Sequence, residues 1–323
     1  MTRFVSTGAL PPAARVQALV TAAHTRYRAN TQGTVSRVYP ALARVEPTLF
    51  GICVVGTDAT VACAGDTDCA FAIMSVAKPF VFALVCAAVG PARVRQRVGV
   101  NATGLPFNSL SAVERSPDGR TNPMVNSGAL ATTSLLPGAS WEEKWALARA
   151  GLSRFAGREL SLDDAVFRSA SATNHRNRAL ARLLESVGAI SADPDETLDL
   201  YTGLCSLSVT ARDLAVMAAT LGDGGVNPLT RERVVDAKSC RHTLAVMASA
   251  GLYETSGDWL YDVGLPGKSG IGGGIVTVSP GKGGLGTFAP LLDRAGNSVK
   301  GKHAATFLAR ELGLDLFASE ATT

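Results

Sequence analysis

Two short stretches of the sequence decide the fold: Ser75-Val76-Ala77-Lys78-Pro79, which opens an apolar run, and Lys268-Ser269-Gly270, which leads into C-terminal strands. The first predicts a buried helix on which the serine and the lysine lie one turn apart on the same face. A serine hydroxyl is a poor nucleophile until a base takes its proton. A lysine can be that base only when burial or nearby positive charge lowers its pKa. The spacing is therefore typical of a serine nucleophile that a lysine activates.

The S-x-x-K tetrapeptide alone is weak evidence, because Ser279 and Lys282 repeat its spacing in a predicted turn where nothing points to catalysis. The order of the two stretches adds weight. An S-x-x-K helix followed late in the chain by a K-[S/T]-G strand is the order found in serine β-lactamases and penicillin-binding proteins. The third element of that group, Ser-x-Asn or Tyr-x-Asn, is absent from the sequence.

The segment from Met1 to Pro12 has no continuous apolar core, so we expect a cytosolic protein without an export signal.

The amino-acid composition argues against nucleic-acid, membrane and metal binding. The 323 residues include 31 Lys and Arg against 27 Asp and Glu, which gives a formal charge of +4. That surplus provides no broad basic field for nucleic acid, and the longest apolar run is well short of the roughly 20 residues of a membrane span. The six cysteines form no CxxC pair and the four histidines are scattered. We therefore expect reduced thiols, no metal site, no cofactor, and no nucleic-acid or membrane partner.

Two glycine-rich stretches resemble nucleotide loops but lack the required context. Gly267-Lys268-Ser269 resembles the end of a phosphate loop, but Asp262 stands where that loop needs a glycine. The glycines from Gly281 to Gly286 match a dinucleotide fingerprint but are not followed by a helix. Turns and positions where the backbone is tightly packed explain these glycines better.

The distribution of strands and helices predicts the architecture. Apolar runs at 49–55 and 59–64 predict a β-hairpin, and strands return at 274–279 and 285–289. Between them the pattern is mainly helical, and further helices are expected after Pro11-Pro12 and at 298–312. We therefore predict an α/β (α+β) fold with one mainly antiparallel sheet built from both chain ends. The expected sheet domain comprises residues 1–74 and 234–323, and the inserted helical domain residues 75–233, with an active cleft where they meet.

Three helix starts are predicted from capping pairs, in which a hydroxyl precedes a carboxylate by three residues. These pairs are Ser140 with Glu143, Ser161 with Asp164, and Thr210 with Asp213.

The sequence resembles the serine-dependent glutaminases over roughly residues 35–312. The matching blocks include Tyr39-Pro40-Ala41-Leu42-Ala43, the stretch from Ser75 to Pro79, Asn122-Pro123-Met124-Val125-Asn126, Arg176-Asn177, Tyr201 with Leu204-Cys205-Ser206, Gly251-Leu252-Tyr253, residues 263–274, and Gly296-Asn297-Ser298. The resemblance implies a serine β-lactamase or transpeptidase-like fold and hydrolysis of L-glutamine to L-glutamate and ammonia through a serine acyl-enzyme. It also implies a homodimer or homotetramer.

The resemblance assigns roles position by position. It makes Ser75 the nucleophile and gives the proton transfers to Lys78 and Tyr253. The amide NH groups of Ser75 and Ile271 match the family's oxyanion hole. The substrate-binding set that it implies is Ser75, Asn126, Asn177, Tyr201, Tyr253, Ile271 and Lys268.

Three positions depart from the family pattern. Ala170 replaces a glutamate that helps to bind the substrate's α-amino group, Val38 replaces a tyrosine, and Met74 replaces a glutamine. Asp163 or Asp164 could supply the missing carboxylate, or the pocket could prefer a primary amide without a free α-ammonium group. A third possibility is that the protein is catalytically silent and only binds a partner. The retention of Ser75, Lys78, Tyr253 and Lys268 argues against this possibility.

Overall fold

A five-stranded antiparallel sheet forms the centre of the molecule in a computed structural model that describes residues 8–190 and 192–319. Its strands, in spatial order, are β3 (Val61–Gly65), β2 (Gly51–Gly56), β8 (Gly283–Phe288), β7 (Gly274–Ser279) and β6 (Gly267–Ser269). Strand β2 pairs with β8, so that Cys53 lies opposite Gly286. The predicted sheet from both chain ends is therefore confirmed.

Two shorter strand pairs, separate from the five-stranded sheet, join segments that are distant in the sequence. Strand β1 (Thr34–Val35) pairs with β9 (Leu291–Leu292), and β4 (Phe71–Ala72) pairs with β5 (Ser208–Val209). The β4–β5 pair fixes the segment that leads directly into Ser75, because Ile73 also donates its backbone NH to the Leu207 carbonyl at 2.8 Å.

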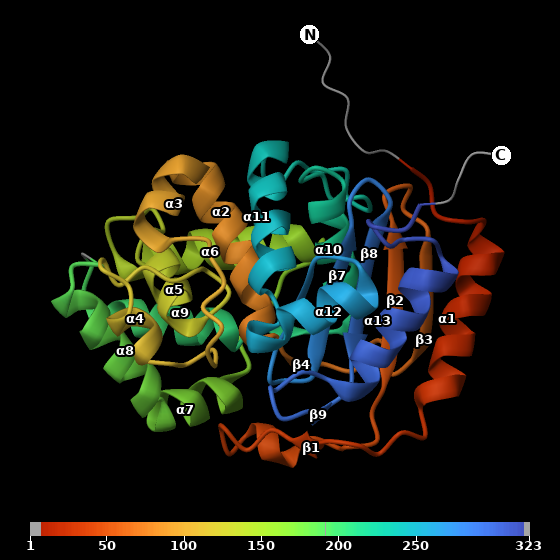
Figure 1. Cartoon of the computed structure of the whole chain (residues 1–323), viewed down its shortest axis with the longest axis horizontal. Coiled ribbons are helices and arrows are strands. Elements are labelled where there is room, and N and C mark those ends of the chain that lie inside the picture. Colours follow the sequence, from red (N-terminus) through yellow and green to blue (C-terminus); the bar gives the residue numbers. More distant parts are fainter. Residues whose placement is uncertain (1–7, 191, 320–323) are drawn as a thin grey trace, which may run out of the picture.

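Most helices form a block on one side of the sheet, whereas α1, α12 and α13 lie on the other side (Figure 1). The α-helices are α1 (Ala13–Tyr27), α2 (Ala77–Val89), α3 (Pro91–Val98), α4 (Ser111–Glu114), α5 (Asn126–Thr133), α6 (Trp141–Ala156), α7 (Asp164–Thr173), α8 (His175–Ser186), α9 (Pro194–Cys205), α10 (Ala211–Gly222), α11 (Ala237–Ala250), α12 (Ser256–Val263) and α13 (Val299–Glu311). Short 3-10 turns occur at η1 (Leu42–Arg44), η2 (Met74–Val76) and η3 (Tyr253–Thr255).

Helix capping follows the sequence at two of the three predicted starts. Ser140 caps α6, and Thr210 with Asp213 forms a capping box at α10. The prediction for α7 was wrong by two residues, because Asp163 rather than Ser161 accepts the Val166 NH, at 3.0 Å. Asp163 is the N-cap of α7 in place of Ser161, because a carboxylate there both accepts the free NH and interacts favourably with the helix dipole.

Alternating side chains of the sheet reach two different cores. Ile52 and Val54 face α1 and α13, whereas Cys53 and Val55 face α10. This follows from the two-residue period of a strand. A third and larger core joins the helical block to the sheet through side chains such as Phe288. The division into domains at residues 74 and 233 stays a prediction.

Glycines in β8 let α10 approach the sheet closely. A Cβ at Gly286 would lie 2.3 Å from the Ala211 carbonyl oxygen and 2.5 Å from the Ala215 nitrogen. A side chain at this position would push the helix away from the strand. Gly286 thus has the close-backbone role that the sequence analysis allowed for these glycines.

No helix in the described ranges is both long and apolar enough to cross a bilayer. Residues 1–7, part of the segment examined for an export signal, lie outside the described residues. All six cysteines are free thiols, of which Cys63 and Cys69 are partly exposed.

Gly286→Ala is expected to lower the free energy of unfolding by about 1–3 kcal/mol, because its methyl group collides with the α10 backbone. Urea unfolding followed by circular dichroism measures this change. Gly257→Ala is the matched control, since no atom lies within 4 Å of a Cβ placed there. Equal stability of the two variants would contradict the packing role of Gly286.

Candidate active site

Ser75 lines a cavity that lies between the helical block and the loop joining β6 to β7. It is 8% exposed and belongs to the 3-10 turn η2, directly before α2, rather than to the helix that the sequence predicts. The cavity holds about 80 Å³, which is room for several water molecules or a small amide side chain. Because η2 leads into the N-terminus of α2, the helix dipole favours negative charge that develops beside Ser75.

Lys78 lies one turn further along, on α2, and is 3% exposed. Burial lowers the pKa of its ammonium group to about 8, although the nearby Cys205 thiol acts in the opposite direction. Its Nζ donates a hydrogen bond to Asn126 Oδ1 at 2.6 Å. A substantial fraction of this amine is therefore neutral near pH 8, as a general base requires.

A chain of buried amides connects Lys78 to the wall of the cavity. Asn126 accepts from Lys78 and from the Tyr201 hydroxyl at 3.2 Å, and its Nδ2 donates to Asn177 Oδ1 at 2.8 Å. Asn177 in turn donates to Asn174 Oδ1 at 2.6 Å. Each amide therefore has its donors and acceptors fixed, so the side chains that face the cavity are held in one orientation.

Tyr253 and Lys268 lie on the sheet side of Ser75. The Tyr253 hydroxyl donates to the Ser269 carbonyl at 3.3 Å, and the Lys268 Nζ lies 3.9 Å from the centre of the Tyr253 ring. Burial raises the pKa of Tyr253, while its contacts with Ser75 and Ser269 act to lower it. Burial and the charge of Lys78 together hold the pKa of Lys268 well below its usual range.

The glycine-rich loop between β6 and β7 passes over the Ser75 turn. A Cβ at Gly270 would lie 3.2 Å from the Ser75 nitrogen, and one at Gly272 would lie 2.5 Å from the Ala72 carbonyl oxygen. Only glycines permit this approach. The loop thereby brings Ile271, which lines the cavity, next to the backbone of Ser75.

Two residues beside Ser75 and Lys268 adopt left-handed backbone conformations that favour glycine. Met74 has φ 48°, and Tyr253 has φ 59°. A left-handed conformation costs a side-chain-bearing residue about 1–2 kcal/mol. Such strain persists where the surrounding structure enforces it, and it clusters at functional sites.

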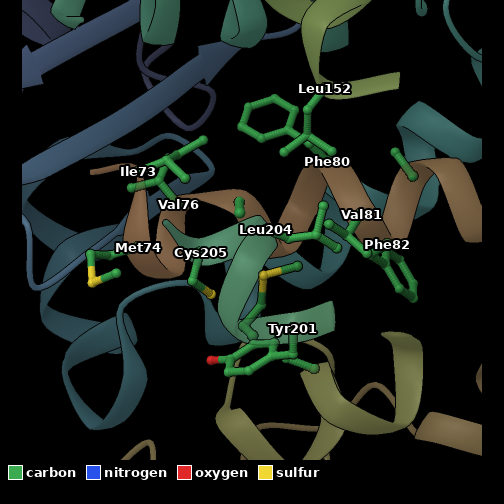
Figure 2. Close-up of a cluster of buried hydrophobic side chains, with 14 of the residues drawn as sticks. Ile73, Met74, Val76, Phe80, Val81, Phe82, Leu152, Tyr201, Leu204 and Cys205 are labelled. Carbon is green, nitrogen blue, oxygen red and sulfur yellow. The ribbon is translucent and has the colours of Figure 1, made fainter. Parts of the chain in front are cut away.

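The cavity brings together Ser75, Asn126, Asn177, Tyr201 and Ile271, which the sequence analysis had placed in one site. Lys78, Tyr253 and Lys268 lie around Ser75 rather than in the lining of this cavity. Figure 2 shows Tyr201, Leu204 and Cys205 of α9 against the segment that carries Met74 and Val76.

Asn174 and Arg176 are cavity-lining residues that the sequence analysis did not assign to the site. Asn174 accepts a hydrogen bond from the Tyr39 hydroxyl at 3.2 Å and so couples the N-terminal segment to the amide chain. Its only sequence signal is its position three residues before Asn177, at the junction of α7 and α8. Arg176 donates to the Asn108 carbonyl.

All three departures from the family pattern, Ala170, Val38 and Met74, line the cavity. Among the described lining residues there is no carboxylate. Asp163 instead caps α7 and lines a separate hollow, and Asp164 is exposed. Within residues 8–190 and 192–319, no group of three His, Cys, Asp or Glu side chains is placed to hold a metal ion.

A buried serine next to a buried lysine, over an antiparallel sheet with inserted helices, is the arrangement of a serine hydrolase with a β-lactamase-like fold. The sequence model of the Glutaminase family matches residues 33–317. The chain belongs to this family, the serine-dependent glutaminases.

Individual relatives agree with this assignment. Glutaminase 2 of Yersinia pestis is 64% identical over 320 residues, which cover 99% of this chain and 94% of the relative. A glutaminase of Colwellia psychrerythraea is 43% identical over 94% of this chain and 97% of its own length. The crystallised probable glutaminase ybaS superposes with a TM-score of 0.94 and 42% identity, covering 96% of this chain and all of that one.

Asn126→Asp is expected to raise the pKa of Lys78, because a carboxylate would replace the amide oxygen 2.6 Å from its Nζ. The rate of ammonia release from glutamine should rise with pH through a midpoint near 8 in the unmodified chain, as Lys78 loses its proton. In the variant this midpoint should move upward by about one pH unit or more. Asn126→Ala is the control without added charge; an upward shift in that variant as well would contradict the electrostatic explanation.

Proposed function

We propose that this chain hydrolyses L-glutamine to L-glutamate and ammonia with Ser75 as the nucleophile. Membership of the glutaminase family supports the reaction. The position of Ser75, in the lining of a small cavity and one turn from a lysine whose pKa is lowered to about 8, is the observation that carries the assignment of the nucleophile. Neither the structure nor the relatives favour another primary amide or a silent binding protein.

The first chemical step forms the acyl-enzyme. Neutral Lys78, with the adjacent Tyr253 hydroxyl, takes the proton as Ser75 Oγ attacks the side-chain carboxamide carbon. The carbonyl oxygen becomes negatively charged, and the NH groups of Ser75 and Ile271 stabilise it together with the N-terminus of α2. Collapse of the tetrahedral intermediate breaks the C–N bond, and the same proton goes to the departing ammonia.

The second step releases glutamate. Water replaces ammonia and attacks the acyl carbon, while the Lys78 and Tyr253 pair again takes the proton and then returns it to Ser75 Oγ. Lys268 is fully buried, and its Nζ donates to the Ser269 carbonyl at 2.6 Å; it adds positive potential to the site while it is protonated. Tyr201, Asn126 and Asn177 hold the rest of the substrate through the oriented polar groups described above.

The proposal also covers where the enzyme acts and how its chains assemble. We expect a cytosolic enzyme that takes a small-molecule amide and needs no nucleic-acid or membrane partner. We also expect a homodimer or homotetramer, which light scattering on the purified protein would distinguish from a monomer.

Ser75→Ala is expected to reduce glutamine turnover by about 10⁴-fold or more, because it removes the nucleophilic oxygen. The ammonia assay measures turnover, and covalent labelling with an electrophilic glutamine analogue should fail in the same variant. Ser279→Ala is the matched control, since Ser279 has the same spacing to a lysine but lies at the β7–β8 turn. Unimpaired turnover by the Ser75 variant would refute the mechanism.

Ala170→Glu is expected to lower KM for glutamine by about tenfold or more, because it places a carboxylate in a cavity lining that has none. The α-ammonium group of glutamine would gain a charge-assisted partner. Ala170→Gln has the same size without the charge and should not reproduce the effect. An unchanged or higher KM in the folded glutamate variant would show that another group binds the amino nitrogen.

A further inference from the structure

Two cysteines face each other across β2 and β3, outside the active-site cavity. Cys53 and Cys63 are direct partners in the strand register, and their Sγ atoms lie 2.9 Å apart. A disulfide requires about 2.05 Å, so the two sulfurs need to approach each other by less than 1 Å. Cys53 is fully buried beneath α10, whereas Cys63 lies on an edge strand and is partly exposed.

The backbone around this pair has the geometry that a cross-strand disulfide needs. Gln17 of α1 donates to the Cys63 carbonyl at 2.9 Å and accepts from the Cys63 NH at 3.2 Å. The NH and carbonyl of Cys63 therefore point away from β2. Cys53 and Cys63 form a non-hydrogen-bonded pair, in which opposite Cα atoms lie about 4.5 Å apart and the side chains are closest. This Cα separation falls within the range of natural disulfides.

The two thiols are chemically unequal. A hydrogen bond with Cys53 and the positive charge of Arg212 lower the pKa of Cys63 to about 7 against the effect of burial, while Asp68 acts to raise it. The same hydrogen bond and burial raise the pKa of Cys53. Burial also raises the pKa of the remaining four thiols, those of Cys69, Cys86, Cys205 and Cys240. Cys63 is therefore the reactive thiol of the chain.

We propose that Cys53 and Cys63 are a modification site at which a hydroperoxide forms a reversible disulfide that links β2 to β3. The Cys63 thiolate attacks a peroxide oxygen, the O–O bond breaks, and an alcohol, or water from hydrogen peroxide, leaves. The Cys53 sulfur then attacks the Cys63 sulfenic acid; hydroxide departs and takes the Cys53 proton as water. The two thiols lose two electrons, which reduce the hydroperoxide, and a dithiol reductant reverses the bond.

The disulfide fits the folded protein, so it stabilises rather than disrupts it. It cross-links residues that are already paired, and it restricts the unfolded chain. Neither sulfur lines the cavity at Ser75. The oxidised enzyme is therefore expected to unfold at a temperature a few degrees higher than the reduced enzyme and to turn over glutamine at the same rate.

Differential alkylation of the full chain tests this proposal. Reduced protein is treated with hydrogen peroxide, its free thiols are blocked with one alkylating reagent, and thiols released by reduction are marked with a second. Cys53, Cys63 and Cys69 lie on one tryptic peptide, because no Lys or Arg occurs between Arg44 and Lys78. The second label should appear on Cys53 and Cys63 of a single, uncrosslinked polypeptide chain, while Cys69 carries the first.

Variants separate this pair from general oxidation. Cys63→Ser should release no thiol on reduction and should show no oxidant-dependent rise in the unfolding temperature. Cys69→Ser, which removes the other partly exposed thiol, should behave as the unmodified chain does. The proposal is overturned if Cys63→Ser still releases two thiols, if Cys53 remains free while Cys63 is oxidised to the sulfinic acid, or if the disulfide joins two chains.

Discussion

The burial of one amine, that of Lys78, is the constraint on which the arrangement of side chains around Ser75 depends. Lys78 is carried into the interior by the apolar face of α2, and desolvation lowers its pKa to about 8. The same burial obliges the protein to give that amine a hydrogen-bond partner, which is Asn126. Asn126 is itself buried and forms hydrogen bonds with Tyr201 and Asn177. The polar residues that line the cavity therefore form one hydrogen-bonded chain that begins at the Lys78 amine.

The segments after residue 250 provide the second wall of the site, opposite the helical block. The loop after β6 runs so close to the Ser75 turn that a Cβ at Gly272 would lie 2.5 Å from the Ala72 carbonyl oxygen, and Tyr253 has a left-handed backbone conformation. The residues to which the resemblance gives catalytic roles therefore come from two segments that are far apart in the sequence. The cavity of about 80 Å³ is lined by residues of both segments, Ser75 and Asn177 from the helical block and Ile271 from the loop after β6.

The sequence predicted the sheet, its hairpin and the serine–lysine pair because each has a local signal: a two-residue alternation, a turn, or a one-turn spacing. The resemblance supplied Tyr253 and Ile271, which have no such signal of their own. Asn174 was missed because its role comes from the Tyr39 hydroxyl 135 positions away. The Asp163 cap was missed by two residues, since adjacent hydroxyl and carboxylate side chains compete for the same helix start.

The pairing of β2 with β8 joins segments more than 200 residues apart. Closing so large a loop is entropically costly and makes folding slow, because the nearby contacts alone cannot complete the sheet. A nascent polypeptide emerging from the ribosome thus carries Ser75 and Lys78 long before their opposite wall exists. The cavity around Ser75 therefore takes its full form only after the C-terminal strands have been made and paired.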